Sequence, residues 1–261
     1  MSVDRVELCH EAAAAGAERA AASFRTGIAA ESKGGDGVDS VTEADRAAQA
    51  TVIETIREAV PGEPVVGEEG DAPDHVPLEG AAWVVDPIDG TVNYVGGHPV
   101  WCTSVACVVD GETVAAASVA PALGDTYVVD RTTTRRDGEP VRVAAESDPG
   151  SFLVNPLYGP GRDHRRECTA TCDVILEEFG DLRRYGCAQL VLASVASGGL
   201  HAAVSTVALN DWDTVAGVAA VRRAGGRVTD ANGDRWEPGA TGLVASNDTA
   251  HETVVAALDG I

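Results

Sequence analysis

The sequence predicts an α/β fold, an α+β sandwich built from two unlike halves. Alanine-rich segments with helical spacing open the chain. β-Branched runs separated by Asp-Gly and Gly-Asp pairs follow, which is the pattern of antiparallel hairpins. After about residue 150, strand-like and helix-like segments alternate, as in folds where helices surround a sheet. Because 44% of the 261 residues are hydrophobic, the chain can bury a core in one large or two compact domains.

The first half is predicted to place two helices on an antiparallel sheet. Helical spacing covers residues 4–29, and Thr42–Asp45 resembles a capping box that opens a second helix ending near Ala59. A short strand over residues 63–69 ends in two acids. Hairpin turns are predicted at Asp110-Gly111, Gly124-Asp125 and Asp137-Gly138.

The second half is predicted to alternate. Its expected helices cover residues 161–179, 187–198, 213–224 and 248–258, and its expected strands cover 151–154, 201–206, 227–230 and 242–245. No linker of low complexity separates the halves. We therefore expect two domains, 1–150 and 151–261, that share one interface with the functional site between them.

The net charge of −22 limits the classes of partner. Such a field disfavours binding to a nucleic-acid backbone, so no nucleic-acid partner is expected. It favours a halophilic protein, because screening over about 3 Å at 1 M salt removes self-repulsion. No run of 18 apolar residues and no signal peptide are found, so the sequence predicts a cytoplasmic protein without a membrane partner.

The six cysteines form no CxxC pair. His164, Cys168 and Cys172 are spaced to share one face of a predicted helix. Either a metal site or a helix face with two small apolar thiols explains that spacing.

Two carboxylates at the end of a predicted strand are the most informative feature. The apolar run Trp83–Val85 ends in Asp86 and Asp89, followed by Gly90-Thr91, where a helix could start. Two unit charges about 4 Å apart cost roughly 4 kcal/mol even at an effective dielectric of 20. A hard cation bound between the two carboxylates would turn this repulsion into a net attraction. The pattern therefore predicts a divalent-metal site beside a backbone cradle for phosphate.

Three further places put acids at the ends of elements, namely Asp45, Glu68 and Asp213. Each has a simpler explanation. Asp45 could complete a helix cap, Glu68 could be a solvated turn residue, and Asp213 could be favoured by a helix dipole.

Together these segments resemble the inositol monophosphatase family, which belongs to a lithium-sensitive superfamily that includes fructose-1,6-bisphosphatases. The resemblance rests on Gly67–Glu69, Asp86–Thr91 and Trp212-Asp213-x-x-Ala216-Gly217, and it covers roughly residues 5–258. It implies a sandwich of alternating αβαβα layers, Mg²⁺-dependent hydrolysis of a small-molecule phosphate ester, and a homodimer or a dimer of dimers.

The resemblance implies a metal-binding role for each acid. Glu68, Asp86 and the Ile88 carbonyl would hold a first Mg²⁺ ion. Asp86, Asp89 and Asp213 would hold a second, and a third, weaker ion would lie near Glu68. Two ions about 3.5–4 Å apart can hold the entering and leaving oxygens of an in-line displacement. Substitution by Mn²⁺ and inhibition by Li⁺ are further implications.

The resemblance also implies three catalytic residues. The Thr91 hydroxyl, oriented by Asp45, would act with Glu68 on the attacking water. The backbone N–H groups of Gly90 and Thr91 would bind the phosphate at a helix N-terminus. No covalent phospho-enzyme is needed.

Four residues are predicted to contact substrate or phosphate, namely Lys33, Arg184, Gly186 and Ala188. Lys33 is the only lysine and stands in a loop where the family often carries one, although a chance loop lysine is the alternative. Gly186 and Ala188 match a turn whose backbone approaches the sugar or inositol in the family. Arg184 could reach a second phosphate or be a solvated arginine at a strand edge.

Two departures from the family leave the substrate open. Thr206 stands where the family has an inositol-binding glutamate, and Cys187 replaces the usual Thr or Ser. The sequence therefore predicts a Mg²⁺-dependent phosphomonoesterase acting on inositol monophosphate or a related sugar phosphate. The alternatives are a fructose-1,6-bisphosphatase, a 3′-phosphoadenosine-type nucleotidase, and a non-catalytic regulatory member of the family.

Overall fold

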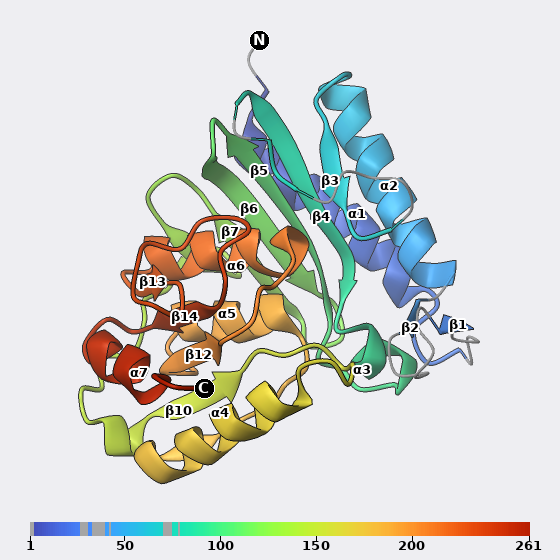
Figure 1. Ribbon diagram of the computed structural model, residues 1–261. Coiled ribbons are helices and arrows are strands. Elements are labelled where there is room, and N and C mark those ends of the chain that lie inside the picture. The colour runs from blue at the N-terminus through green and yellow to red at the C-terminus, as the bar shows by residue number, and fades with distance from the viewer. Residues whose placement is uncertain (1–2, 27–30, 33–39, 42, 70–74, 78) are drawn as a thin grey trace.

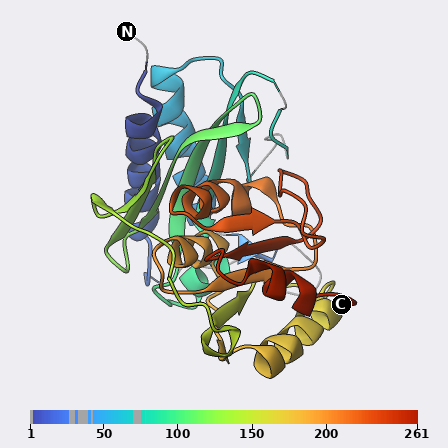
Figure 2. The same ribbon diagram turned by 90° about the vertical axis from the view of Figure 1, so that its left-hand side faces the viewer.

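The chain folds into five layers that alternate between helices and sheets, as the αβαβα prediction states (Figures 1 and 2). The computed structural model describes residues 3–26, 31–32, 40–41, 43–69, 75–77 and 79–261. The described helices are α1 (Arg5–Ala21), α2 (Glu43–Ala59), α3 (Thr91–Val95), α4 (Arg165–Glu178), α5 (Ala188–Ala196), α6 (Asp211–Arg223), α7 (His251–Ala257) and the 3₁₀ turn η1 (Pro149–Ser151). None of these helices combines the length and apolarity needed to cross a membrane.

Helices α1 and α2 form the first layer and cover one face of the larger sheet (Figure 1). Their apolar faces are rich in alanine, so the two helices can approach closely. At Gly16 a Cβ atom would lie 2.5 Å from Cγ2 of Val52, which leaves room for glycine alone. The small side chains of this half thus set the spacing of its first layer.

The larger sheet is mostly antiparallel. Its strands, in spatial order, are β3 (Val65–Gly67), β4 (Ala81–Asp89), β5 (Cys102–Val109), β6 (Glu112–Ala120), β7 (Asp125–Val129), β8 (Thr134–Arg136) and β9 (Glu139–Pro140). Only β3 and β4 run parallel. The predicted turns at Asp110-Gly111 and Asp137-Gly138 are confirmed, and Asp110-Gly111 has φ values of 50° and 78°, as a two-residue hairpin turn requires. The third hairpin is present, but its turn covers residues 121–124, and Asp125 is already the first residue of β7.

Helices α5 and α6 lie between the two sheets and contact both. They pack closely, because a Cβ at Gly217 would lie 2.5 Å from Cβ of Leu192. The strands of the smaller sheet, in spatial order, are β11 (Asp181–Leu182), β10 (Leu153–Pro156), β12 (Ala202–Ser205), β14 (Leu243–Ser246) and β13 (Arg227–Thr229). A separate two-stranded ribbon pairs β1 (Glu31–Ser32) with β2 (Ser40–Val41). Helices α4 and α7 complete the fifth layer.

Several element boundaries differ from the prediction by two or more residues: α4 begins at Arg165 instead of residue 161, α7 at His251 instead of 248, and β10 covers Leu153–Pro156 instead of 151–154. Two further differences lie near the candidate site. Helix α1 ends at Ala21 because Phe24 turns inward and packs against Tyr94 and Trp101, with ring centroids 5.4 and 5.3 Å away. Helix α6 begins at Asp211, two residues earlier than expected, which places Asp213 in its first turn. Thr42 of the predicted capping box lies outside the described residues, and the division into domains at residue 150 stays a prediction.

Candidate active site

The C-terminal end of β4 carries the two predicted carboxylates. The pairing of β4 with β5 shifts register between Asp86 and Asp89, so the strand bulges where the acids stand. Both side chains are buried. One carboxylate oxygen each from Asp86, Asp89 and Asp213 lie within 4.8 Å of one another. The fold therefore brings together three acids that the sequence separates by up to 127 positions.

Asp86 lies at the centre of this acid cluster, which we define as Glu68, Asp86, Asp89 and Asp213. Its Oδ1 atom is buried and has no hydrogen-bond partner in the described part of the chain. Burial, followed by the charges of Glu68, Asp89 and Asp213, raises the pKa of Asp86 well above its usual range. A buried carboxylate oxygen that faces other carboxylates suits a divalent cation, which prefers oxygen ligands.

Asp89 also holds the N-terminus of α5. Its Oδ1 accepts the Ala188 amide at 3.0 Å, and its Oδ2 accepts the Gln189 amide at 2.5 Å and the Cys187 thiol at 3.1 Å. Burial raises the pKa of Asp89 to about 6, against the lowering effect of these three donors. A carboxylate has about four acceptor sites, so Asp89 retains capacity for a cation.

Glu68 and Asp213 approach the pair from neighbouring elements. Glu68 follows β3, the parallel neighbour of β4, and its charge raises the pKa of Asp86. Asp213 lies in the first turn of α6, and its Oδ2 accepts the Asn210 amide at 2.9 Å. Three of the four acids thus converge, and Glu68 lies near enough for its charge to act on Asp86.

Gly90 and Thr91 continue from the acid cluster into α3. Gly90 has φ 89° and ψ 39°, a conformation that disfavours any side chain. A Cβ there would also lie 2.9 Å from the Val100 carbonyl oxygen. The Thr91 hydroxyl lies 3.0 Å from the Ile88 carbonyl and 3.4 Å from Oδ1 of Asp45. The predicted Thr91–Asp45 pair is therefore brought together, and the buried Asp45 also has other interactions.

Of the predicted substrate residues, Gly186 lies beside Gly90, where a Cβ atom would be 3.2 Å from the Gly186 carbonyl oxygen. The Gly186 carbonyl accepts a hydrogen bond from Asn93 at 3.3 Å, and the Ala188 amide is already bonded to Asp89. Arg184 is exposed, and its Nη2 donates to the Tyr158 carbonyl at 3.3 Å. Lys33 lies outside the described residues. The contacts of these residues with a substrate stay predictions.

Tyr158 contacts both Thr206 and Arg184. Its hydroxyl lies 2.9 Å from the Thr206 hydroxyl, while its carbonyl accepts from Arg184. Thr206 is therefore held by a neighbouring phenol in the place where the family has an acid.

Three amide side chains that the sequence analysis did not single out tie the acid-bearing elements together. Asn93 donates to the carbonyls of Val100 and Tyr185 at 2.8 and 2.7 Å. Gln189 donates to the Trp212 carbonyl at 2.6 Å and accepts the Gly217 amide at 2.7 Å. Gln49 bonds to both backbone groups of Glu69, at 2.6 and 3.0 Å.

Asp211 is a further buried acid that the sequence analysis passed over. Its Oδ2 accepts the Val76 amide at 2.9 Å, so it holds the backbone at Val76. Its position two residues before Asp213 was a signal that could have found it.

His164, Cys168 and Cys172 do not bring their ligand atoms together in the described structure. Among the described residues, the groups whose ligand atoms converge are the three aspartates and a set formed by Asp89, Cys102 and Cys187. The interpretation of Cys168 and Cys172 as small thiols on a helix face is the better one.

Comparison with known proteins gives one family. A sequence profile described as the inositol monophosphatase family matches residues 3–261. A "Nus factor SuhB" from Pseudomonas aeruginosa is 34% identical over 212 residues, which cover 76% of this chain and 74% of that protein. A "Fructose-1,6-bisphosphatase/inositol-1-monophosphatase" from Thermotoga maritima is 32% identical over 220 residues, covering 83% and 81%.

Solved structures agree with these relatives. An IMPase from Thermotoga maritima superposes with a TM-score of 0.84 at 28% identity, covering 97% of this chain and 94% of that one. The extragenic suppressor protein suhB from Bartonella henselae gives 0.89 at 25% identity, covering 99% and 100%.

The expectation of no nucleic-acid partner was wrong, because several similar proteins are named Nus factor SuhB. The physical reason is that net charge is an average over the whole surface. It says nothing about a local patch of opposite sign, and this chain gathers four arginines at one place. Salt adaptation stays a prediction, and a single chain does not test the predicted homodimer.

Proposed function

The chain belongs to the inositol monophosphatase family, and we propose that it hydrolyses phosphate monoesters with the help of Mg²⁺. The observation that carries this proposal is the convergence of Asp86, Asp89 and Asp213 within 4.8 Å, with a buried Asp86 oxygen that lacks a protein partner in the described residues. Like charges at that separation are unfavourable without a cation. The same arrangement therefore supports both the metal and the reaction.

The proposed metal ligands are Glu68, Asp86, Asp89, Asp213 and the Ile88 carbonyl. Cations bound there would place positive charge opposite the phosphate and lower the pKa of the attacking water. Three donors fix the direction of the Asp89 carboxylate before any ligand binds. Binding a cation therefore costs less conformational entropy at this side chain.

Thr91 and Glu68 are the proposed groups that act on the water. The Thr91 hydroxyl has acceptors at Ile88 and Asp45, so it donates its proton there and turns its lone pairs outward. In that orientation Thr91 accepts a hydrogen bond from the water, and Glu68 takes up the proton that the water loses. The amides of Gly90 and Thr91 are the proposed phosphate contacts.

The substrate we propose is inositol monophosphate or a related sugar phosphate. Thr206 and Arg184 both contact Tyr158, so this corner of the site offers hydroxyls and one guanidinium instead of an acid. A guanidinium favours a substrate with a second anionic group. Fructose 1,6-bisphosphate is therefore the main rival, and the Thermotoga maritima relative carries both activities in its name.

The test is phosphate release from inositol 1-phosphate, fructose 1,6-bisphosphate and 3′-phosphoadenosine 5′-phosphate, each with Mg²⁺ and with EDTA. We expect release that depends on Mg²⁺ and is lost in Asp213→Asn. Asp213 is a better target than Asp89, because Asp89 also holds α5. The control is Asp259→Asn, which removes one acid from the exposed C-terminal end. Equal release by Asp213→Asn and the control would remove the proposed mechanism.

A role like that of the relatives named Nus factor is the second candidate, supported by their identity of up to 34% to this chain. On this second candidate, the partner binds a surface other than the acid cluster. The test is fluorescence anisotropy of a labelled RNA titrated with the chain at two salt concentrations. Saturable binding that Asp213→Asn retains would support this role, and no binding at either salt concentration would remove it.

A further inference from the structure

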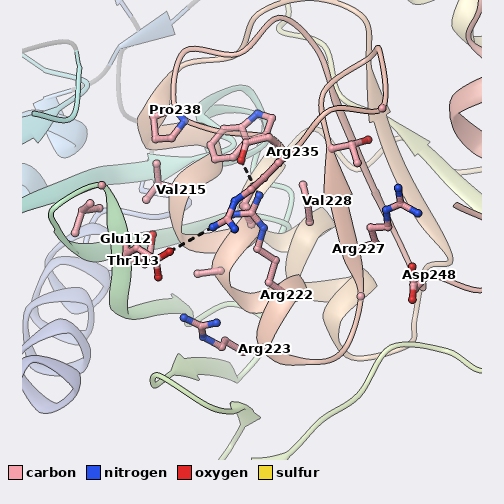
Figure 3. A pocket seen from close by; sticks show the side chains of 18 residues that line it. Glu112, Thr113, Val215, Arg222, Arg223, Arg227, Val228, Arg235, Pro238 and Asp248 are labelled. Carbon is pink, nitrogen blue, oxygen red and sulfur yellow. Dashed lines mark hydrogen bonds and ion pairs between the residues drawn. The ribbon is translucent and has the colours of Figure 1, made fainter. Parts of the chain in front are cut away.

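A second charged cluster lies at the opposite end of α6 from the acids. There the β5–β6 turn, the last turns of α6, β13 and the loop that follows it enclose a cavity of about 610 Å³ (Figure 3). Four arginines line it, namely Arg222, Arg223, Arg227 and Arg235. None of the four acids lines the cavity, and along α6 Arg223 lies ten positions after Asp213, which is about 15 Å of helix. The cavity is thus distinct from the proposed active site.

Three of the four arginines have partners. Arg222 donates to the Trp236 carbonyl at 2.6 Å, and Arg235 lies 3.3 Å from Oε1 of Glu112. Arg227 pairs with Glu252 at 2.6 Å. Figure 3 shows Arg222 and Arg235 beside Glu112, with Arg223 close by and Arg227 on the far side next to Asp248.

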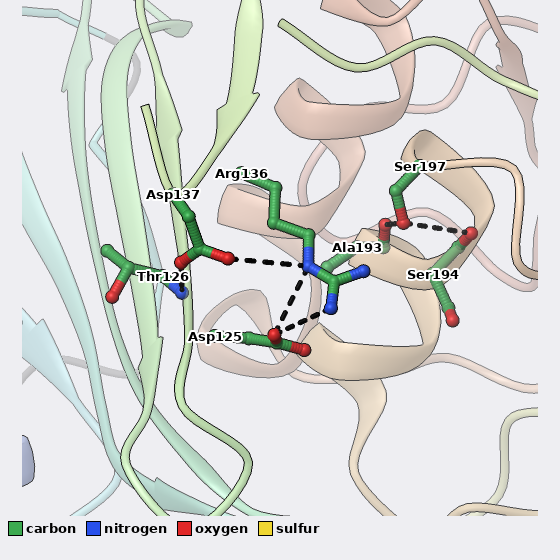
Figure 4. Close-up of polar contacts among 7 residues, drawn as sticks. All are labelled: Asp125, Thr126, Arg136, Asp137, Ala193, Ser194 and Ser197. Carbon is green, nitrogen blue, oxygen red and sulfur yellow. Dashed lines mark hydrogen bonds and ion pairs between the residues drawn. The ribbon is translucent and has the colours of Figure 1, made fainter. Parts of the chain in front are cut away.

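Arg223 differs from the other three. Its Nε atom is buried without a hydrogen-bond partner, and no ion pair of this side chain is found in the part of the chain that the structure describes. Acids outnumber bases by 41 to 19 in this chain, so a partner would have been easy to supply. Arg136 shows the ordinary arrangement, with Asp125 at 2.7 Å and Asp137 at 3.6 Å (Figure 4). A buried N–H group without a partner costs free energy and needs an explanation.

The helix dipole explains only part of this cluster. Cations in the last turn of a helix are stabilising, which accounts for Arg222 and Arg223. It does not account for Arg227 and Arg235, which reach the same cavity from β13 and the following loop. Burial, and then the charge of Arg235, lowers the pKa of Arg222, so the guanidinium groups repel one another here.

We propose that this cavity binds a small dianion of the phosphate-monoester class. The planar fork of a guanidinium matches two phosphate oxygens. Among the lining residues, four arginines face two carboxylates, Glu112 and Asp248, an excess of two positive charges that a dianion would balance. The volume lies within the range of small-ligand sites, about 300–1,000 Å³. Arg223 lines the same cavity and has no ion pair in the described residues, which leaves its guanidinium to add to this excess.

The test uses glycerol 3-phosphate as the probe, with EDTA present so that no divalent cation can recruit it to the acid cluster. Isothermal titration calorimetry of the full chain should give one saturable site at constant ionic strength set with KCl. Arg223→Gln and Arg235→Gln should each weaken binding at least about tenfold, the size of a lost charge-assisted hydrogen bond.

Two controls keep the result specific. Arg57→Gln removes the same charge from the last turn of α2 and should bind like the wild type. Asp213→Asn should also bind the probe, because the acid cluster is not involved. Arg223→Gln should melt no lower than the wild type without the probe, since it removes a buried N–H group that has no partner in the described residues.

Three outcomes would overturn the proposal. They are no saturable heat with the wild type, wild-type affinity in both Arg223→Gln and Arg235→Gln, or loss of binding in Asp213→Asn. The last would place the anion at the acid cluster instead.

Discussion

The two ends of α6 carry clusters of opposite charge. Its first turn brings Asp213 to the acid cluster, and its last turn brings Arg222 and Arg223 to the arginine-lined cavity. Each cluster holds more like charge than a helix dipole of about half a unit charge can balance. Each also has a buried polar atom without a partner among the described residues, Oδ1 of Asp86 and Nε of Arg223. Two unbalanced clusters of opposite sign indicate two sites for ligands of opposite sign.

The clusters also shift nearby titrating groups in opposite directions. Burial and three neighbouring acids raise the pKa of Asp86. Burial and then the charge of Arg227 lower the pKa of His251, beside the arginine cluster, to about 4. Burial contributes to both shifts, because it opposes any charge. The neighbouring charges add to the effect of burial: acids further disfavour the carboxylate of Asp86, and an arginine further disfavours the protonated form of His251. Each end of α6 can therefore be tested separately.

The largest effect is expected for Asp86→Asn. Without metal the variant should melt at a higher temperature than the wild type, because it removes a buried carboxylate from three others. With Mg²⁺ at about 100 times its Kd, the wild type should gain about 2.7 kcal/mol and the variant far less. Phosphate release should fall at least about 100-fold, since even indirect metal partners cost about 10–100-fold.

Differential scanning calorimetry with EDTA and with Mg²⁺ measures both parts of this prediction. Arg223→Gln is the matched control at the other end of the helix, and its response to Mg²⁺ should equal that of the wild type. A wild type that melts at the same temperature with and without Mg²⁺ would contradict the metal site.

The acid end could be predicted from the sequence, whereas the arginine end could not. Asp86–Thr91 is one continuous motif, and few residue types bind hard cations, so spacing and chemistry were informative together. Arg222 and Arg223 look like ordinary residues of a last helical turn, and Arg235 looks like a loop residue. Only the packing of α6 against the β5–β6 turn and β13 brings them together.

The layers were predicted for a similar reason, while the connections between them were not. Periodicity and turn pairs such as Asp110-Gly111 identify elements locally. The amide ties made by Asn93, Gln49 and Gln189 depend on partners that tertiary packing supplies. An Asn or Gln has no sequence signal that distinguishes such a tie from a surface residue.

A smaller effect is expected for Gly90→Ala, which tests how tightly the acid end is built. A side chain with this positive φ costs about 1–2 kcal/mol. The new Cβ would also press on the Val100 carbonyl at 2.9 Å and on Cβ of Cys187 at 3.1 Å. We expect a loss of about 3 kcal/mol in the free energy of unfolding, with overpacking as the second contribution.

Gly124→Ala is the matched control, because Gly124 has φ 78° and open space around its Cβ position. It should show only the conformational cost in urea unfolding. Equal losses of unfolding free energy in the two variants would mean that Val100 and Cys187 move aside for the new Cβ at no cost. The acid end would then be less rigid than its contacts indicate.

The smallest effect concerns pH at the arginine end. His251 is buried between Thr229 and Ser246, with ring nitrogens 3.0 and 2.7 Å from their hydroxyls. Its folded pKa of about 4 lies below the ordinary value of 6.5, so the unfolded chain binds the proton first as the pH falls. The stability that neutral His251 allows is complete above pH 6.5 and is lost progressively toward pH 4.

Arg227→Gln separates the effect of the Arg227 charge from the effect of burial on the pKa of His251. Burial stays, but the repelling cation is gone, so the pKa of His251 should rise and part of the acid sensitivity should disappear. The pKa can be followed by NMR of the ring protons, and melting curves between pH 7 and 4 report the stability. Arg57→Gln should leave both unchanged. If Arg227→Gln also left the pKa of His251 unchanged, burial alone would set it. The two ends of α6 would then differ in ligand chemistry but not in the field they impose on their neighbours.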